Sequence, residues 1–292
     1  MNNKYPVFTR RRFIHSSFGI AATLKLQSAA RAQGLTQPKG VCRLSARQET
    51  GPYYIPGELL RSDIVEGRAG VPLSLRIVLL DSRTCMPVPD AAVDLWHCGA
   101  VGLYSGFTKQ SPLGPPPPEG GPPGPRFGSF EHGPGGPGSM GPPPDHGPTD
   151  KLTFLRGIQL TGADGSVDFR TVFPGFYMGR TNHIHFKVRI GGHASRKSYE
   201  AGHTSYIGQI FFPEEVAAEL MQHDPYRRHK LHRTTQAEDR VFGGQQGELS
   251  IAQLRPLHPG HPAAGLSADI VTAIDPEGTG DDGFGPGSAP LR

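Results

Sequence analysis

Phe173-Pro174-Gly175-Phe176-Tyr177-Met178-Gly179-Arg180-Thr181-Asn182-His183-Ile184-His185 begins as a Pro/Gly loop with one tyrosine and ends in a predicted strand. In this strand, polar side chains alternate with an apolar set formed by Ile184, Phe186, Val188 and Ile190. Because side chains on a strand alternate between its faces, His183 and His185 point to the same side, about 7 Å apart along the chain. The pattern predicts a strand that buries one face and offers two histidines to a metal ion. A half-exposed strand that merely contains histidine would show the same alternation.

The composition favours short strands around this segment. The 292 residues include 40 Gly and 30 Pro, and only 36% are hydrophobic, which is atypical of a helical bundle. Alternating patterns predict strands at 73–79, 91–97, 153–160, 167–172, 183–190, 205–212 and 268–274, with 153–160 and 167–172 forming a hairpin. Pro213 opens a short helix to about Met221. We therefore predict an all-β, single-domain antiparallel β-sandwich with long loops and one short helix.

Three segments fall outside this sandwich. Residues 1–32 contain Arg10-Arg11-Arg12, a short apolar run and Ala30-Arg31-Ala32. They resemble a twin-arginine (Tat) signal, which predicts export to the periplasm or the extracellular space by the Tat machinery; a mitochondrial-type or merely basic tail is the alternative. In the predicted insertion 108–150, 24 of the 35 residues from Gly114 to Pro148 are Gly or Pro. We predict disorder there and in the tail 276–292, and a single domain over 33–275.

Charge and cysteine content exclude several classes of protein. A net charge of +4 without a basic and aromatic array does not favour nucleic-acid binding. No apolar run is long enough for an integral membrane span. Cys42, Cys85 and Cys98 are too few and too scattered for a zinc module, and the sequence does not say which two of them could form a disulfide.

Two tyrosines on glycine-flanked loops complete the candidate metal site. Tyr104 lies in Gly102-Leu-Tyr-Ser-Gly106, and Tyr177 leads directly to His183 and His185. A phenol has an ordinary pKa near ~10, so it ligates well only when the cation is acidic enough to bind it as phenolate. Fe(III) does this better than Zn(II), and the absence of a nearby carboxylate disfavours a two-histidine, one-carboxylate Fe(II) site. Either tyrosine alone would more often be a loop-packing aromatic.

Five runs of residues resemble the intradiol ring-cleavage dioxygenases, which open catechols with non-haem Fe(III). They lie between Cys42 and Phe212 and comprise Gln48–Tyr54, Val93–His97, Tyr104–Gly106, Phe154–Gly157 and Pro174–His185. The resemblance implies one Fe(III) per chain, with Tyr104, Tyr177, His183 and His185 as its ligands. It places Arg180 and Gln209 over the ring of a catechol-type substrate, which would react with O2 to give a cis,cis-muconate.

The same resemblance implies a role in catalysis for Tyr177 and for Arg180. Tyr177 would leave the metal and accept a substrate proton, and Arg180 would stabilise developing negative charge, although a purely structural role of Arg180 in its loop is the alternative. Position 176 is Phe where close relatives are expected to have Trp. Catechol 1,2-dioxygenases of this family carry a helical N-terminal segment that builds the dimer, whereas here only a short segment separates Ala32 from the first core residues, so the oligomeric state is open.

A non-catalytic secreted β-sandwich of transthyretin-like architecture is the alternative to an enzyme, and O2 consumption would distinguish the two. A zinc hydrolase would need a general-base carboxylate near the histidines, and none is evident. The sequence does not identify the ring substituents that are accepted or the role of the insertion.

Overall fold

The computed structural model describes residues 42–109, 147–196 and 198–279. The predicted export signal, most of the predicted insertion and the tail beyond residue 279 lie outside these ranges. Residues 276–279 make defined contacts: Pro276 O lies 3.0 Å from His203 Nε2, and Glu277 pairs with Arg83 at 2.8 Å.

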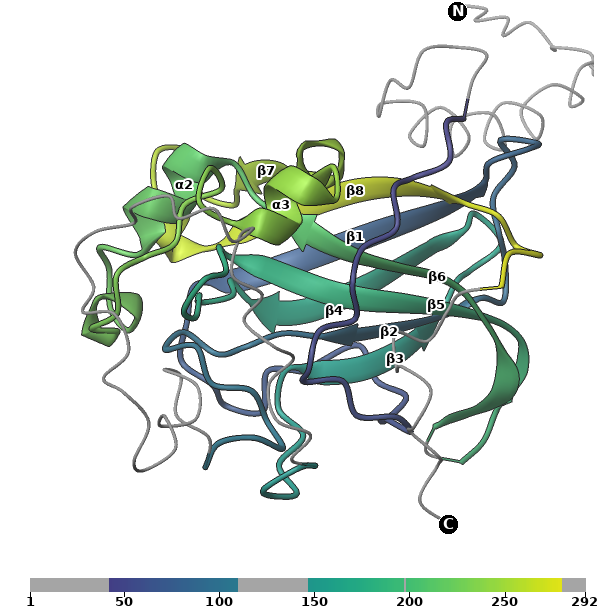
Figure 1. Ribbon diagram of the computed structural model, residues 1–292, viewed down its shortest axis with the longest axis horizontal. Coiled ribbons are helices and arrows are strands. Elements are labelled where there is room, and N and C mark those ends of the chain that lie inside the picture. Colours follow the sequence, from purple (N-terminus) through teal and green to yellow (C-terminus); the bar gives the residue numbers. More distant parts are fainter. Residues whose placement is uncertain (1–41, 110–146, 197, 280–292) are drawn as a thin grey trace, which may run out of the picture. The chain divides into compact units, whose positions relative to one another are not determined.

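The fold is a sandwich of two four-stranded sheets, which confirms the predicted all-β class (Figure 1). One sheet has the order β4-β1-β8-β7 and the other the order β3-β2-β5-β6. The strands are β1 (Pro72–Asp81), β2 (Ala92–Trp96), β3 (Arg156–Leu160), β4 (Ser166–Val172), β5 (His183–Ala194), β6 (Tyr199–Phe211), β7 (Gln253–Pro256) and β8 (Leu266–Ile274).

The core lies between the sheets and follows from period-2 alternation. Alternate residues of β1 are buried, and the apolar face of β5 packs in the same cluster. A strand that places apolar side chains at every second position can bury them only against a second sheet. The cluster includes Leu73, Leu75, Ile77, Val93, Leu95, Val167, Phe169, Ile184, Phe186, Val188, Leu266 and Ala268.

The prediction of a wholly antiparallel sandwich was wrong for one pair of strands. β1 and β8 run parallel, with Leu73 opposite Leu266 and Asp81 opposite Ile274. Parallel neighbours cannot be joined by a tight turn. These two strands come from opposite ends of the described chain, so their direction is independent of any turn pattern.

The predicted hairpin of 153–160 and 167–172 was also wrong. β3 pairs with β2, whereas β4 pairs with β1 in the other sheet. The turn is present, since Gly162 N donates to Ser166 O at 3.0 Å, but it carries the chain from one sheet to the other. Alternation and a turn predict two strands, and they do not predict which strand each one pairs with.

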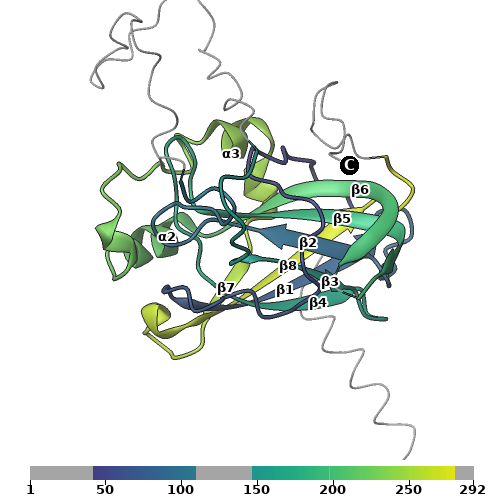
Figure 2. The same ribbon diagram turned by 90° about the horizontal axis from the view of Figure 1, so that it is seen from below.

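The helices α2 and α3 lie towards one end of the sandwich (Figures 1 and 2). The predicted helix is confirmed as α2 (Glu214–Leu220), which follows Pro213. The prediction of one short helix was incomplete, because the described chain also contains α3 (Arg240–Gly244) and 3₁₀ helices at Tyr226–Arg228, Gly247–Ser250 and Pro262–Ala264. Asp239 caps α3 by accepting from Val241 N and Phe242 N.

The polar face of β5 is buried. His183, His185 and Lys187 are only 1%, 1% and 3% exposed. The N-terminal strap, residues 43–61, covers this face: Gln48 N donates to Ile207 O of β6, and the Lys187 ammonium lies 3.9 Å from the Tyr54 ring centroid. The strap therefore gives the sheet a second buried face.

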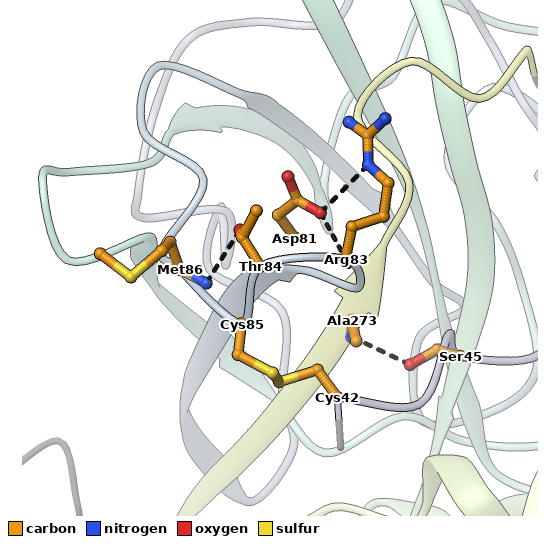
Figure 3. Close-up of a disulfide and its surroundings, with 8 residues drawn as sticks. All are labelled: Cys42, Ser45, Asp81, Arg83, Thr84, Cys85, Met86 and Ala273. Atoms are coloured by element: carbon orange, nitrogen blue, oxygen red, sulfur yellow. Dashed lines mark hydrogen bonds and ion pairs between the residues drawn. A yellow bond between two sulfur atoms is a disulfide. The ribbon is translucent and has the colours of Figure 1, made fainter. Parts of the chain in front are cut away.

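A disulfide between Cys42 and Cys85 anchors the start of the strap beside the end of β1 (Figure 3). The two Cα atoms lie 5.4 Å apart, and Ser45 Oγ accepts from Ala273 N at 3.0 Å just beyond it. Cys98 is a buried free thiol. In the described part of the chain, no helix has the length and apolar character needed to cross a membrane.

Candidate metal centre

The structure brings Tyr104, Tyr177, His183 and His185 into one cluster. The ring centroids of Tyr104 and Tyr177 lie 5.8 Å apart, those of Tyr177 and His183 5.6 Å, and those of the two histidines 4.7 Å. Tyr104 lies in the loop after β2, Tyr177 lies in the loop before β5, and the histidines begin β5. Two segments that are far apart in the sequence thus converge on one point.

Two glycines allow the loops that carry the tyrosines to pack directly on each other. A Cβ at Gly175 would lie 2.4 Å from Gly99 O, and a Cβ at Gly102 would lie 2.4 Å from Phe176 O. Gly102 also has a φ of +78°, a conformation that side chains disfavour. These contacts fix the spacing between the two tyrosine loops.

The segment 223–232 supports the loop before β5 from the other side. Tyr226 is buried, and its hydroxyl donates to Phe173 O at 2.7 Å and accepts from Val71 N at 2.9 Å. His229 stacks on Phe176 with ring centroids 4.4 Å apart. Of the histidines in this segment, His223 and His232 are exposed, whereas His229 is half-buried.

The two histidines face each other through Nε2 atoms 3.0 Å apart. His183 Nδ1 lies 2.7 Å from Thr181 O, so it carries the proton and leaves Nε2 with a free lone pair. Burial, aided by the Arg180 charge, lowers the pKa of both histidines well below the usual range. They are therefore neutral imidazoles, the form that binds metals.

The two phenols are protonated when no metal is bound. Burial raises the pKa of Tyr104, and the neighbouring Tyr177 raises it further. Desolvation also raises the pKa of Tyr177, whereas Arg180 opposes the shift. Tyr104 is buried, and its hydroxyl has no hydrogen-bond partner among the residues that the structure describes. Tyr177 is partly exposed, and its hydroxyl lies 3.5 Å from Arg180 Nη1.

Arg180 and Gln209 lie beside this cluster and contact each other. Arg180 Nη2 donates to Gln209 Oε1, and Gln209 stands opposite His185 in the β5–β6 register. Asp239 accepts from Arg180 Nε at 3.1 Å and from Thr181 N at 2.9 Å. A buried carboxylate therefore fixes the guanidinium and balances its charge.

Three side chains at this site were missed from the sequence. Tyr53 stacks on Tyr104 at 4.4 Å, Trp96 stacks on His185 at 5.1 Å, and Asp239 pairs with Arg180. Tyr53 and Trp96 lie in runs that carried the family resemblance, which was a usable signal. For Asp239 the only signal was its suitability as a helix cap, and that says nothing about Arg180.

The cluster suits a cation that binds phenolate. Within residues 42–109, 147–196 and 198–279, no group of three or more His, Cys, Asp or Glu side chains could hold a metal ion. A site here must therefore use the tyrosines. The unpartnered Tyr104 hydroxyl and the facing Nε2 atoms are the donors that a metal would satisfy.

Solved structures resemble most of this chain. An intradiol ring-cleavage dioxygenase from Tetranychus urticae is 31% identical with a TM-score of 0.63, and the match covers 82% of this chain and 98% of that one. A second structure, of a dioxygenase, matches with the same four values: 31%, 0.63, 82% and 98%. The dioxygenase domain of a carbohydrate-binding protein fusion from Streptomyces sp. SirexAA-E is 21% identical with a TM-score of 0.45, covering 80% of this chain and 99% of that one. No protein-family model and no curated protein matches the chain.

Proposed function

Because the chain belongs to the intradiol ring-cleavage dioxygenase family, we propose that it opens a catechol-type ring with O2 at one non-haem Fe(III) ion. Tyr104, Tyr177, His183 and His185 would hold the ion. The observation that carries the proposal is the convergence of two phenols and two neutral imidazoles, with Arg180 beside them.

The ligand set determines how protons move when the metal binds. His183 and His185 need lose no proton, because both are already neutral. Tyr104 and Tyr177 must each lose one, since burial keeps them protonated. Iron binding would therefore release protons and tighten as pH rises.

Bound Fe(III) would supply the Lewis acidity that binds both catechol oxygens and draws electron density from the ring. Tyr177 Oη would accept a proton from a substrate hydroxyl. Desolvation makes the Tyr177 phenolate strongly basic, and the partial exposure of this side chain suits a group that moves.

Arg180 and Gln209 would orient the substrate and stabilise charge. The guanidinium is fixed by Asp239 and Gln209, so it needs little reorganisation when negative charge develops near Tyr177. The product expected from cleavage between the hydroxyl-bearing carbons is a cis,cis-muconate, which assigns the protein to aromatic compound catabolism.

We also propose that the protein is exported by a twin-arginine signal in residues 1–32. The Cys42–Cys85 disulfide supports this, because such bonds persist mainly in oxidising compartments.

Colour and oxygen uptake test the proposed reaction. Iron-loaded protein should show a tyrosinate-to-iron charge-transfer band, and Tyr177→Phe should alter the band and abolish most O2 uptake with catechol, protocatechuate or hydroxyquinol. Tyr199→Phe is the matched control: the Tyr199 hydroxyl accepts from Gly192 N at the far end of the β5–β6 hairpin, so the band should be unchanged.

A colourless protein that retains one equivalent of zinc would contradict the proposal. Catechol binding without O2 consumption would instead support a non-catalytic binding protein.

A further inference from the structure

Arg156, in the run Phe154–Gly157, has no role in the chemistry described so far. It begins β3, stands opposite Trp96 in the register, and is fully buried. Its guanidinium lies 5.9 Å from the Tyr104 ring centroid. Because burying a charge is unfavourable, a buried cation this close to a candidate ligand must be stabilised by specific contacts.

The guanidinium joins two segments that meet at the metal centre. Arg156 Nε donates to Ser105 Oγ at 2.8 Å, and Nη2 donates to Ser105 O and to Tyr53 O, each at 2.8 Å. Ser105 directly follows Tyr104, and Tyr53 belongs to the N-terminal strap. The planar fork of Arg156 therefore ties the Tyr104 loop to the strap.

Ser105 extends this connection to the residues just before β3. Its hydroxyl donates to Phe154 O at 2.6 Å while accepting from Arg156. The loop is thus bonded through both the backbone and the side chain of the residue next to Tyr104, which restricts the Tyr104 Cα.

The position of Tyr104 depends on such backbone contacts. Its hydroxyl has no hydrogen-bond partner in the described chain, so only the backbone and ring packing place it. Tyr53, whose backbone carbonyl accepts from Arg156, contacts both tyrosines through its ring. This ring stacks on the Tyr104 ring with centroids 4.4 Å apart, and it meets the Tyr177 ring edge-on with centroids 5.7 Å apart. Arg156 therefore contacts both features that place Tyr104: the backbone of its loop and the residue whose ring packs on it.

Glu58 balances the buried charge. Its Oε1 atom lies 3.8 Å from Arg156 Nε, and its side chain is 5% exposed. Burial raises the pKa of Glu58 to about 7, and Arg156 limits the rise. A lysine at 156 would keep this pairing but could not bond Ser105 and Tyr53 together in the same plane.

We propose that Arg156 is a positioning residue that holds Tyr104 in place for iron through Ser105 and Tyr53. This inference depends on the proposed function for its iron-dependent part. Its structural part, the restraint of the two segments, holds in the metal-free protein.

Arg156→Lys tests both parts. In metal-free protein, amide hydrogen exchange should quicken in peptides covering 48–56 and 100–109, and not in the β1–β8 pair. In loaded protein, the charge-transfer band should shift or weaken, and Fe(III) affinity should fall about 10-fold or more, as is typical when support of a ligand is lost. Ser105→Ala, a smaller change, should move the same readouts in the same direction.

Arg189→Lys is the matched control. Arg189 also donates to two carbonyls, Tyr199 O and Ala201 O, on the same sheet away from the histidines. Unchanged exchange in Arg156→Lys would overturn the inference whether or not iron binds. If exchange quickens but wild-type protein shows no charge-transfer band, the proposed function fails and the restraint stands.

Discussion

Arg180 depends on a carboxylate that lies far from it in the chain. Asp239 is fully buried and accepts hydrogen bonds from Arg180, Thr181 and the first turn of α3. One side chain thus joins the loop before β5 to a helix. Its position in the sequence gives no sign of this, because an aspartate before a short helix is an ordinary cap.

Asp239→Asn should therefore destabilise the protein and disturb Arg180. Asparagine still caps a helix, but it leaves the buried guanidinium without its main counter-charge, which should lower the free energy of unfolding by about 3 kcal/mol. Urea denaturation measures this. Asp224→Asn, which removes an exposed partner of Arg227, is the control and should have little effect. Equal stability of the two variants would contradict the assigned role of Asp239.

Buried His97 should make stability depend on pH. It lies between Thr171 Oγ1 at 2.7 Å and Cys98 O at 2.9 Å, and burial lowers its pKa from 6.5 to about 4. Below pH 6.5 the unfolded chain binds a proton at His97 that the folded protein does not. The stabilisation is therefore present above pH 6.5 and decreases towards pH 4, by about 3 kcal/mol.

A difference measurement isolates this contribution of His97. The raised pKa values of Glu58, about 7, and Asp94, about 6, act in the opposite direction over the same pH range. The difference in unfolding free energy between wild type and His97→Gln should therefore be followed from about pH 7 to about pH 4. A pH-independent difference would rule out a neutral buried imidazole.

At the scale of single elements, alternation along a strand was an informative pattern. It predicted β1, β2, β5 and β8, and it placed His183 and His185 on one side of a strand. Pairing was not predictable, because the partner of β3 or β4 depends on which sheet buries its apolar face. The burial of the polar face of β5 also depends on the strap, a segment more than 120 residues earlier in the chain.

The four candidate ligands could be found from sequence because they lie in two short runs with distinctive flanking glycines. Tyr53 and Arg156 were within recognised runs, but their contacts involve segments that only folding brings together. Spacing along the chain carries no information about such contacts.

The packing of the two tyrosine loops predicts a steric effect at Gly175. A methyl group there would overlap Gly99 O and Ala100 O, which are backbone atoms that cannot move aside independently. Gly175→Ala should lower the free energy of unfolding by about 2 kcal/mol and weaken iron binding, measured by urea denaturation and metal titration. Gly147→Ala is the control, because no atom of the described residues lies within 4 Å of its added Cβ. Wild-type behaviour of Gly175→Ala would show that the loops do not pack in this way.

At the scale of the whole molecule, the strap ties the two sheets together. Ser45 bonds Ala273 of β8, and Gln48 bonds Ile207 and Gln209 of β6, so one segment contacts both sheets before it covers the histidines. The cysteine pairing that anchors it could not be read from the sequence, since three cysteines allow three pairs.

Removing the Cys42–Cys85 bond should therefore loosen the molecule from its N-terminal end. For a sequence separation of 43 residues, loop-closure entropy predicts a loss of about 4 kcal/mol. Unfolding of wild type with and without a thiol reductant measures it, and the double variant Cys42→Ser, Cys85→Ser should match reduced wild type. Cys98→Ser should remain sensitive to the reductant. Insensitivity of wild type would contradict the anchoring role.

Asp150 bonds the segment that contains Tyr104 to the segment that begins at Gly147. Its carboxylate accepts from Gly106 N at 3.0 Å and from Thr108 N at 2.8 Å, so the described segment that ends at Lys109 is bonded to the one that begins at Gly147. Loop-closure entropy rises only slowly with the number of residues between two such fixed points. A change in the length of the sequence between Lys109 and Gly147 should therefore leave the Tyr104 loop in place, because its bonds to Asp150 come from the described residues on either side.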